Sequence, residues 1–288
     1  LRMEKSAILS ALATEVKQGR LFFSTSANTA IHIKNKLEDP DCNLDSAIHL
    51  IKAEPLFAAK VVGIANSVIF NRTGKEVTDI RSAMTLIGMR TVRSLAIAIV
   101  VQQLAGPQQK NPMVVELWQH STHVAALARV IARHITKQNP DTALFAGIIH
   151  EISWFYLLSR EKHFPGLMDE SAATAWASDE DLKNESELEC EIQIGSAILK
   201  ALSVPTPVLE GIICLWKGHL SSPPTTLGDT LLFANQLAPV KSPLTLTLNQ
   251  TGDDIMYGLH SLIDEQALQD LLKESEHEVK SLTKALNS

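Results

Sequence analysis

The sequence has little of what marks several large classes of proteins. Its three cysteines, Cys42, Cys190 and Cys214, show no paired spacing, so neither a disulfide framework nor a thiolate zinc site is indicated. Only ten residues are Tyr or Phe, and no segment alternates between apolar and polar residues as a half-buried strand does. The longest apolar run, residues 95–101, is too short to span a bilayer, and no signal peptide is recognised at the start. We therefore expect a cytoplasmic protein without a membrane segment.

Nucleotide-binding and hydrolase motifs are also missing. The sequence contains no Gly-rich phosphate loop, no GxGxxG and no GxSxG, which excludes P-loop and Rossmann folds and the common serine hydrolases. The formal net charge of −6, without a dense cluster of cations, argues against a nucleic-acid partner. Residues 1–106 carry 13 basic and 9 acidic side chains, whereas residues 107–288 carry 13 and 23. This asymmetry fits two lobes with separate roles, or two lobes that attract each other.

The pattern of apolar residues predicts an all-α fold. Nearly every segment repeats apolar residues every three to four positions. The segment GPQQKNP at residues 106–112 is the best candidate for a linker. It divides the chain into an N-terminal five-helix bundle at residues 1–106 and a C-terminal helical bundle at residues 107–288. The second lobe ends in an amphipathic helix that begins at Asp264, which we expect to pack on its own lobe, with homodimerisation as the alternative.

The stretch ALFAGIIHEISWFYLL, residues 143–158, is predicted to be one buried helix with the polar pair His150–Glu151 in its middle. Asn139, Pro140 and Asp141 favour its start, because Asn caps a helix, Pro suits the first turn and Asp is stabilised by the positive end of the helix dipole. Buried polar groups need partners. The pair is therefore either hydrogen-bonded for packing or part of a metal site.

Segments that follow one another in both halves of the chain resemble the HDOD family, the HD-related output domains of bacterial signalling. In the first half, residues 37–70 and 78–98 contain an Asp-Pro break, Glu54-Pro55 in place of a second Asp-Pro, and the sequence Ala65-Asn66-Ser67. In the second half the matching segments are WQHS, LFAGIIHEI, EIQIGSAILKALSVP and LLFANQLA. The resemblance covers about residues 21–238 and implies a helical signalling module.

The HDOD family is related to the HD-domain metal-dependent phosphohydrolases, which hold a divalent metal with a His, an adjacent His-Asp pair and a later Asp. The resemblance implies that the corresponding positions here are His120, His150, Glu151 and Asn235. A further His of that family is replaced by Glu191, and His219 is a candidate for a histidine of a later loop.

These substitutions weaken the implied metal site. Glu151 keeps the negative charge of Asp but moves the carboxylate out by one methylene group, and Asn235 offers only a neutral carbonyl oxygen. We therefore predict that the four positions form a degenerate HD site with no metal and no other cofactor. The alternative is that they hold Mn, Fe, Zn or Mg. No catalytic residue is predicted.

The resemblance implies a non-catalytic bacterial signal-transduction module of the HDOD type, with a signalling protein or a nucleotide second messenger as its partner. The alternative is a divalent-metal-dependent phosphohydrolase that acts on a nucleotide or a phosphate ester. Two charged groups are further candidates for binding, although each is also typical of solvated surface. They are the acidic stretch at residues 179–191 and the cations Arg72, Lys75, Arg81, Arg90 and Arg93.

Overall fold

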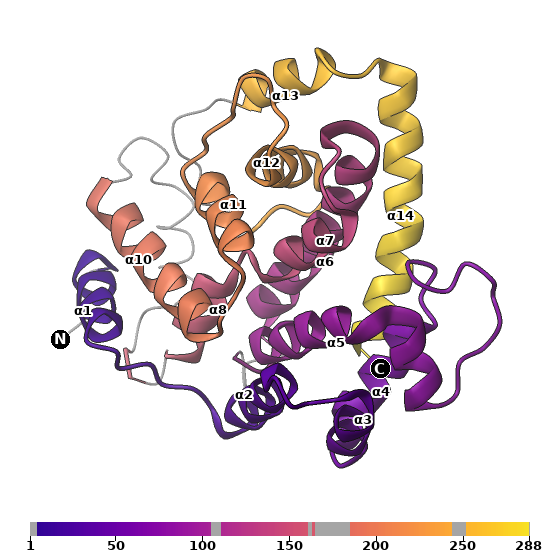
Figure 1. Ribbon diagram of the computed structural model, residues 1–288. Helices are drawn as coiled ribbons and strands as arrows, with labels where there is room; N and C mark the ends of the chain where they lie inside the picture. Colours follow the sequence, from indigo (N-terminus) through magenta and orange to yellow (C-terminus); the bar gives the residue numbers. More distant parts are fainter. Residues whose placement is uncertain (1–4, 105–110, 161–162, 165–184, 244–251, 288) are drawn as a thin grey trace.

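A computed structural model describes residues 5–104, 111–160, 163–164, 185–243 and 252–287 (Figure 1). Within these residues every regular element is a helix and there is no strand, so the all-α prediction is confirmed. The first part of the chain forms α1 (Lys5–Lys17), α2 (Thr25–Glu38), α3 (Leu44–Lys52), α4 (Pro55–Ala65) and α5 (Ile80–Leu104).

Polar side chains set the starts of these helices as the sequence suggests. Asn43 accepts a hydrogen bond from the backbone N–H of Ser46 and so caps α3. Asp79 accepts one from the N–H of Ser82 at the start of α5. Asn66 ends α4 and also bonds Val77 through both its side-chain oxygen and nitrogen, which fixes the loop between α4 and α5.

The helix α5 contains a sharp bend at Gly88. This residue has φ 79° and ψ 155°, a conformation that is essentially restricted to glycine. The half of α5 that follows the bend is strongly buried along residues 95–101. The bend lets one continuous helical segment change direction while its second half enters the core.

The remaining elements build the second part of the molecule. They are α6 (Pro112–Ile131), the π-helical turn η2 (Ala132–Thr136), α7 (Pro140–Ile149), α8 (Ile152–Ser159), α10 (Glu185–Ala201), α11 (Thr206–Trp216), α12 (Leu227–Leu237), α13 (Gly252–His260) and α14 (Glu265–Asn287).

The prediction of one helix at residues 143–158 is wrong in one respect. The start is as expected, since Asn139 accepts from the N–H of Thr142 and Pro140 occupies the first turn. However, the helix is interrupted at His150 and Glu151, and the chain continues as a second helix, α8. Glu151 has φ −91° and ψ 18°, outside the α-helical region. The physical reason is tertiary: the chain leaves the helical path at Glu151, and the polar pair contacts partners on other helices.

The helices pack around α6 and α7, which lie in the centre of the molecule (Figure 1). The long helix α14 runs along one side and contacts both α6 and α4, so it does not pack on the second half alone as expected. At the opposite side α1 packs against α10. One hydrophobic core cluster includes residues of both halves. Each half therefore contributes a terminal helix to the other.

Some predictions concern residues outside the described part of the chain. Residues 106–110 of the candidate linker lie outside the described residues, so the boundary between residues 106 and 107 stays a prediction. Residues 179–184 of the acidic stretch at residues 179–191 lie outside them as well.

Two described stretches, Ile80–Leu104 and Pro140–Ser159, are long and apolar enough to cross a membrane, but 56% and 89% of their most apolar windows are buried inside the protein. That burial is typical of core helices of a soluble protein.

Candidate metal centre

Three parts of the fold bring the four predicted site residues together. His120 lies on α6, His150 and Glu151 form the break between α7 and α8, and Asn235 lies on α12. The helix α6 packs against both α7 and α12. His120 forms a hydrogen bond with the side chain of Asn235, which joins the fourth position to the group.

The donor atoms of three of these residues form a compact triangle. The Nε2 atoms of His120 and His150 are 3.3 Å apart. The Oε1 atom of Glu151 lies 3.5 Å from Nε2 of His120 and 3.6 Å from Nε2 of His150. All three side chains are buried, with exposed fractions between 1% and 9%.

The other nitrogen of each imidazole is bound to the backbone. Nδ1 of His120 lies 2.8 Å from the carbonyl oxygen of Val240, and Nδ1 of His150 lies 2.6 Å from that of Gly147. A carbonyl oxygen only accepts, so each Nδ1 carries the hydrogen and each neutral ring presents a lone pair at Nε2. Two lone pairs and one carboxylate therefore face one another. A proton or a metal ion placed among these acceptors would stabilise the arrangement.

Burial shapes the charges of the centre. It lowers the pKa of His150 to about 3, with the neighbouring His120 adding to the shift. It also lowers the pKa of His120, against the opposing effect of the hydrogen bonds to Val240 and Asn235. Burial raises the pKa of Glu151 to about 7, although a hydrogen bond with Ser242 acts in the other direction. Near neutral pH both imidazoles are uncharged and the carboxyl group is close to half ionised.

The sequence analysis did not identify the residues that hold the centre in place. The indole Nε1 of Trp216 donates to the carbonyl oxygen of His150 at 3.0 Å and fixes the backbone at the helix break. Val240 and Gly147 contribute only carbonyl oxygens, and Ser242 only a hydroxyl group. Every residue type has a backbone carbonyl, so no sequence signal could have identified Val240 and Gly147.

Comparison with known proteins settles the family. The HDOD domain family matches residues 24–217, about two thirds of the sequence. This chain belongs to the HDOD family. The prediction made from the ordered segments in both halves is therefore confirmed. No curated protein matches the chain.

Solved structures share the HDOD fold over nearly the whole chain. A protein of Shewanella amazonensis described as a "Putative metal-dependent phosphohydrolase" has a TM-score of 0.72 at 21% identity, covering 97% of this chain and 99% of its own. An HDOD domain protein of unknown function from Geobacter sulfurreducens has a TM-score of 0.61 at 19% identity, covering 99% of both chains. A "Putative signal transduction protein" of Marinobacter aquaeolei has a TM-score of 0.64 at 16% identity, covering 99% of this chain and 66% of its own. At these identities the likeness shows the fold alone.

The spacing of His120, His150 and Glu151 fits a divalent metal ion. Three ligands of a tetrahedral ion with bonds near 2.1 Å lie roughly 3.4 Å apart. The observed separations of 3.3, 3.5 and 3.6 Å match this spacing. Metal-binding histidines usually donate their second N–H to a carbonyl or carboxylate, as His120 and His150 do here. The three residues are also the group within the described chain that qualifies as a potential metal site.

Other candidates from the sequence lie outside this group. His123 places Nδ1 2.8 Å from the carbonyl oxygen of Gln119 on its own helix and does not form a metal pair with His120. His219 is exposed, and Glu191 is buried but is not part of the metal-like triangle.

Two of the five cations of the first half already have partners within that half. Arg81 pairs with Asp45, and Arg93 donates to the carbonyl oxygen of Leu37. The idea that all five cations form one phosphate site therefore loses support.

Proposed function

We propose that this protein is a non-catalytic HDOD signalling module of the bacterial cytoplasm, in which the His120–His150–Glu151 triangle stabilises the fold. The observation that carries this proposal is the burial of the triangle. A phosphohydrolase must admit a phosphate ester and an attacking water to its metal. His120 is 1% exposed and His150 is 2% exposed, and both are enclosed by helices and by the Val240 backbone.

The residue types support the same proposal. Two neutral imidazoles and one carboxylate supply a single negative charge against a divalent cation, because Asn235 contributes none. A carboxylate with a pKa of about 7 is also partly protonated at neutral pH and must lose that proton before it binds a metal. An ion held here would be bound more weakly than in a site with two carboxylates.

The partner of such a module would be a signalling protein or a nucleotide second messenger, acting on one copy or on a homodimer. The continuous core that joins both halves supports a module that responds as a unit.

The test combines metal content with hydrolysis. The protein would be purified without chelators and its metals measured by elemental mass spectrometry. It would then be assayed with p-nitrophenyl phosphate and bis-p-nitrophenyl phosphate in the presence of added Mn²⁺. We expect no hydrolysis above that of the His150→Ala variant, whatever the metal content. Hydrolysis that disappears in His150→Ala would overturn the proposal.

A metal-dependent phosphohydrolase is the second candidate, and the spacing of the three donor atoms favours it. A bound ion would polarise a phosphoryl group and lower the pKa of a coordinated water. His120, His150 and Glu151 would hold that ion, and Asn235 would orient His120 through its hydrogen bond. Metal-dependent turnover that rises in Asn235→Asp would identify this function.

A further inference from the structure

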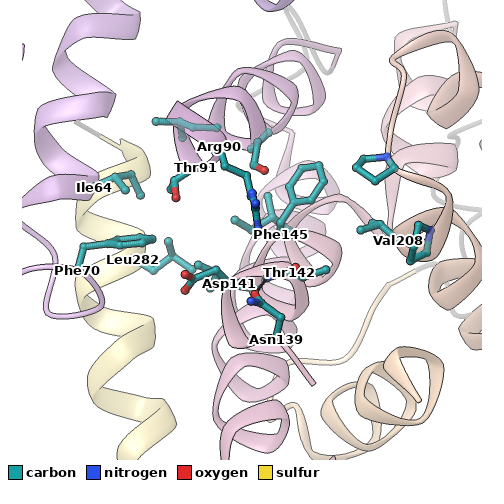
Figure 2. Close-up of a pocket in the computed structure, with 17 residues that line it drawn as sticks. Ile64, Phe70, Arg90, Thr91, Asn139, Asp141, Thr142, Phe145, Val208 and Leu282 are labelled. Carbon is teal, nitrogen blue, oxygen red and sulfur yellow. Dashed lines mark hydrogen bonds between the residues drawn. The ribbon is translucent and has the colours of Figure 1, made fainter. Parts of the chain in front are cut away.

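A cavity of about 420 Å³ lies between the two halves of the molecule, apart from the metal centre (Figure 2). Its walls come from the second half of α5, one side of α7, the start of α11, the loop after α4, and single residues of α4 and α14. None of the four site residues of the metal centre lines it. The cavity therefore requires an explanation of its own.

The size and the walls of the cavity limit what it can hold. Its volume falls within the range of sites that bind small molecules, about 300 to 1,000 Å³. At about 30 Å³ for each water-sized group, it has room for roughly 14 non-hydrogen atoms. Most of the lining is apolar, with aromatic or large aliphatic side chains on opposite walls, including Phe70, Phe145, Leu144, Ile148, Val208 and Leu282.

Only two of the lining residues are charged, Arg90 and Asp141. The carboxylate of Asp141 is about half exposed and lies 3.5 Å from Nε of Arg129, which is not in the lining and also pairs with Glu278. Arg90 has no ion pair or hydrogen bond with any residue that the structure describes. Its guanidinium group is therefore available to a ligand of the cavity.

Arg90 stands at the mouth of the cavity. Its side chain is exposed, and Figure 2 shows it pointing from α5 toward Phe145 and the N-terminal end of α7. The hydroxyl-bearing residues Thr91 and Thr142 line the same region. An anionic group placed here would stay near water, while an apolar body could enter between the hydrophobic walls.

We propose that the cavity binds a small amphipathic molecule with one anionic head, such as a carboxylate or a phosphate monoester, and an apolar body of about ten atoms. The planar guanidinium group of Arg90 would bind the head through paired N–H donors. A cyclic dinucleotide fits less well, because its two phosphates and polar bases would meet one cation and mostly apolar walls. Binding here does not depend on the proposed function, since it involves none of the residues of the metal centre.

The test uses decanoate as the charged probe and decanol as its uncharged counterpart, with isothermal titration calorimetry on the full chain. Four proteins would be compared: the natural sequence, Arg90→Gln, Arg20→Gln and Ser94→Phe. Arg20 is an exposed arginine outside the lining and gives the matched control. Ser94 lines the cavity, so a phenyl ring at this position would fill it. Thermal unfolding would show that each variant is folded.

The natural protein should bind decanoate at least about tenfold more tightly than decanol, because a hydrogen bond to a charged group is stronger than one between neutral groups. Arg90→Gln should remove this difference, Arg20→Gln should keep it, and Ser94→Phe should weaken both probes. Failure of decanoate to bind would overturn the proposal. Equal binding of decanoate by the natural protein and by Arg90→Gln would overturn it as well.

Discussion

At the residue scale, the candidate metal centre consists of three buried acceptors that could share one cation. The two Nε2 atoms and the Glu151 carboxylate face one another within 3.6 Å, and burial keeps both imidazoles neutral. The carboxyl group is the member of the triangle whose pKa, about 7, lies closest to neutral pH. Its proton and a metal ion therefore compete for the same place.

The stability of the metal-free protein should depend on pH through Glu151. Its pKa is raised on folding from 4.5 to about 7, so its stabilising effect is complete below pH 4.5 and is lost as the pH rises through 7. Between pH 5 and pH 8 we expect the natural protein to lose up to about 3 kcal/mol of stability relative to Glu151→Gln. Urea unfolding in the presence of a chelator at several pH values measures this difference.

The comparison of the two proteins isolates Glu151 from the histidines. The pKa of His150 is lowered to about 3, so its effect is present above pH 6.5 and is lost in acid, in both proteins alike. If the stabilities of the natural protein and Glu151→Gln change in parallel from pH 5 to pH 8, the pKa of Glu151 is not raised by burial.

Restoring both aspartates of the HD pattern should strengthen metal binding. The double variant Glu151→Asp with Asn235→Asp adds a negative charge beside His120, the residue that Asn235 already contacts. We expect Mn²⁺ or Zn²⁺ affinity to rise at least about tenfold by titration calorimetry, a typical scale for residues around a metal site. Gln236→Glu, one position further along α12, adds the same charge away from the centre and should change little. Equal gains in both variants would indicate a general charge effect, and no gain would refute the alignment of these positions.

The residues of the centre could be predicted from sequence only where the residue type itself carries the chemistry. His120, His150, Glu151 and Asn235 were found through the resemblance to the HD-domain phosphohydrolases, and the structure brings them together. The carbonyl groups that fix the two imidazoles belong to Val240 and Gly147, where any residue type offers the same atom. Their role depends on distance in space, which no local pattern encodes.

At the scale of helices, the spacing of the centre depends on how closely α6 and α7 approach. A Cβ atom at Gly147 would lie 2.5 Å from the Cα of Ala125, so the two backbones are in contact there. His120 lies on α6, and α7 ends directly before His150. Gly147 also supplies the carbonyl oxygen that binds Nδ1 of His150.

Replacing Gly147 by alanine should therefore harm both stability and metal binding. Backbone atoms cannot move aside as a flexible side chain can, so α6 and α7 must separate, at a cost of about 1–3 kcal/mol. The imidazoles would separate with them and bind metal more weakly. Gly88→Ala gives the control. It should lower the stability by a similar amount, because alanine is strained at a φ of 79°. However, its Cβ would meet no atom within 4 Å, and residue 88 lies far along the chain from the centre. Urea unfolding together with Zn²⁺ titration separates the two effects, and unchanged metal affinity in Gly147→Ala would contradict this link.

The break between α7 and α8 shows where periodicity fails as a predictor. Residues 143–158 have the apolar pattern of one buried helix, and nothing in the residue types requires an interruption. The interruption arises because His150 and Glu151 contact His120 on α6. Trp216 on α11 stabilises the break by donating a hydrogen bond to the backbone carbonyl of His150. Tertiary contacts thus override the local preference at the polar pair.

At the scale of the whole molecule, α14 joins the two halves. The sequence predicted its amphipathic face from residues such as Leu268, Leu271 and Leu282, all of which are buried. It could not predict the surface that this face covers, because an apolar stripe specifies burial without specifying a partner. The structure shows α14 against both α6 and α4, with Lys60 of α4 bonded to the carbonyl of Leu286.

A buried ion pair fixes α14 to the centre of the fold. Arg129 of α6 contacts Glu278 of α14 at 2.5 Å, and its second nitrogen donates to the carbonyl of Ile69 in the loop after α4, at 3.2 Å. Burial raises the pKa of Glu278, while Arg129 and Arg133 hold it down. Three parts of the chain therefore meet at one guanidinium group.

Removing one member of this pair should be more harmful than removing both. In Arg129→Met the carboxylate of Glu278 stays buried with only the more distant Arg133, at 3.6 Å, and we expect a loss of about 3–5 kcal/mol. The double variant with Glu278→Met removes both charges of the pair and should lose less stability than Arg129→Met alone. A double-mutant cycle from urea unfolding measures the coupling. Additive losses would mean that Arg129 and Glu278 are not coupled and that this ion pair does not hold α14 to α6.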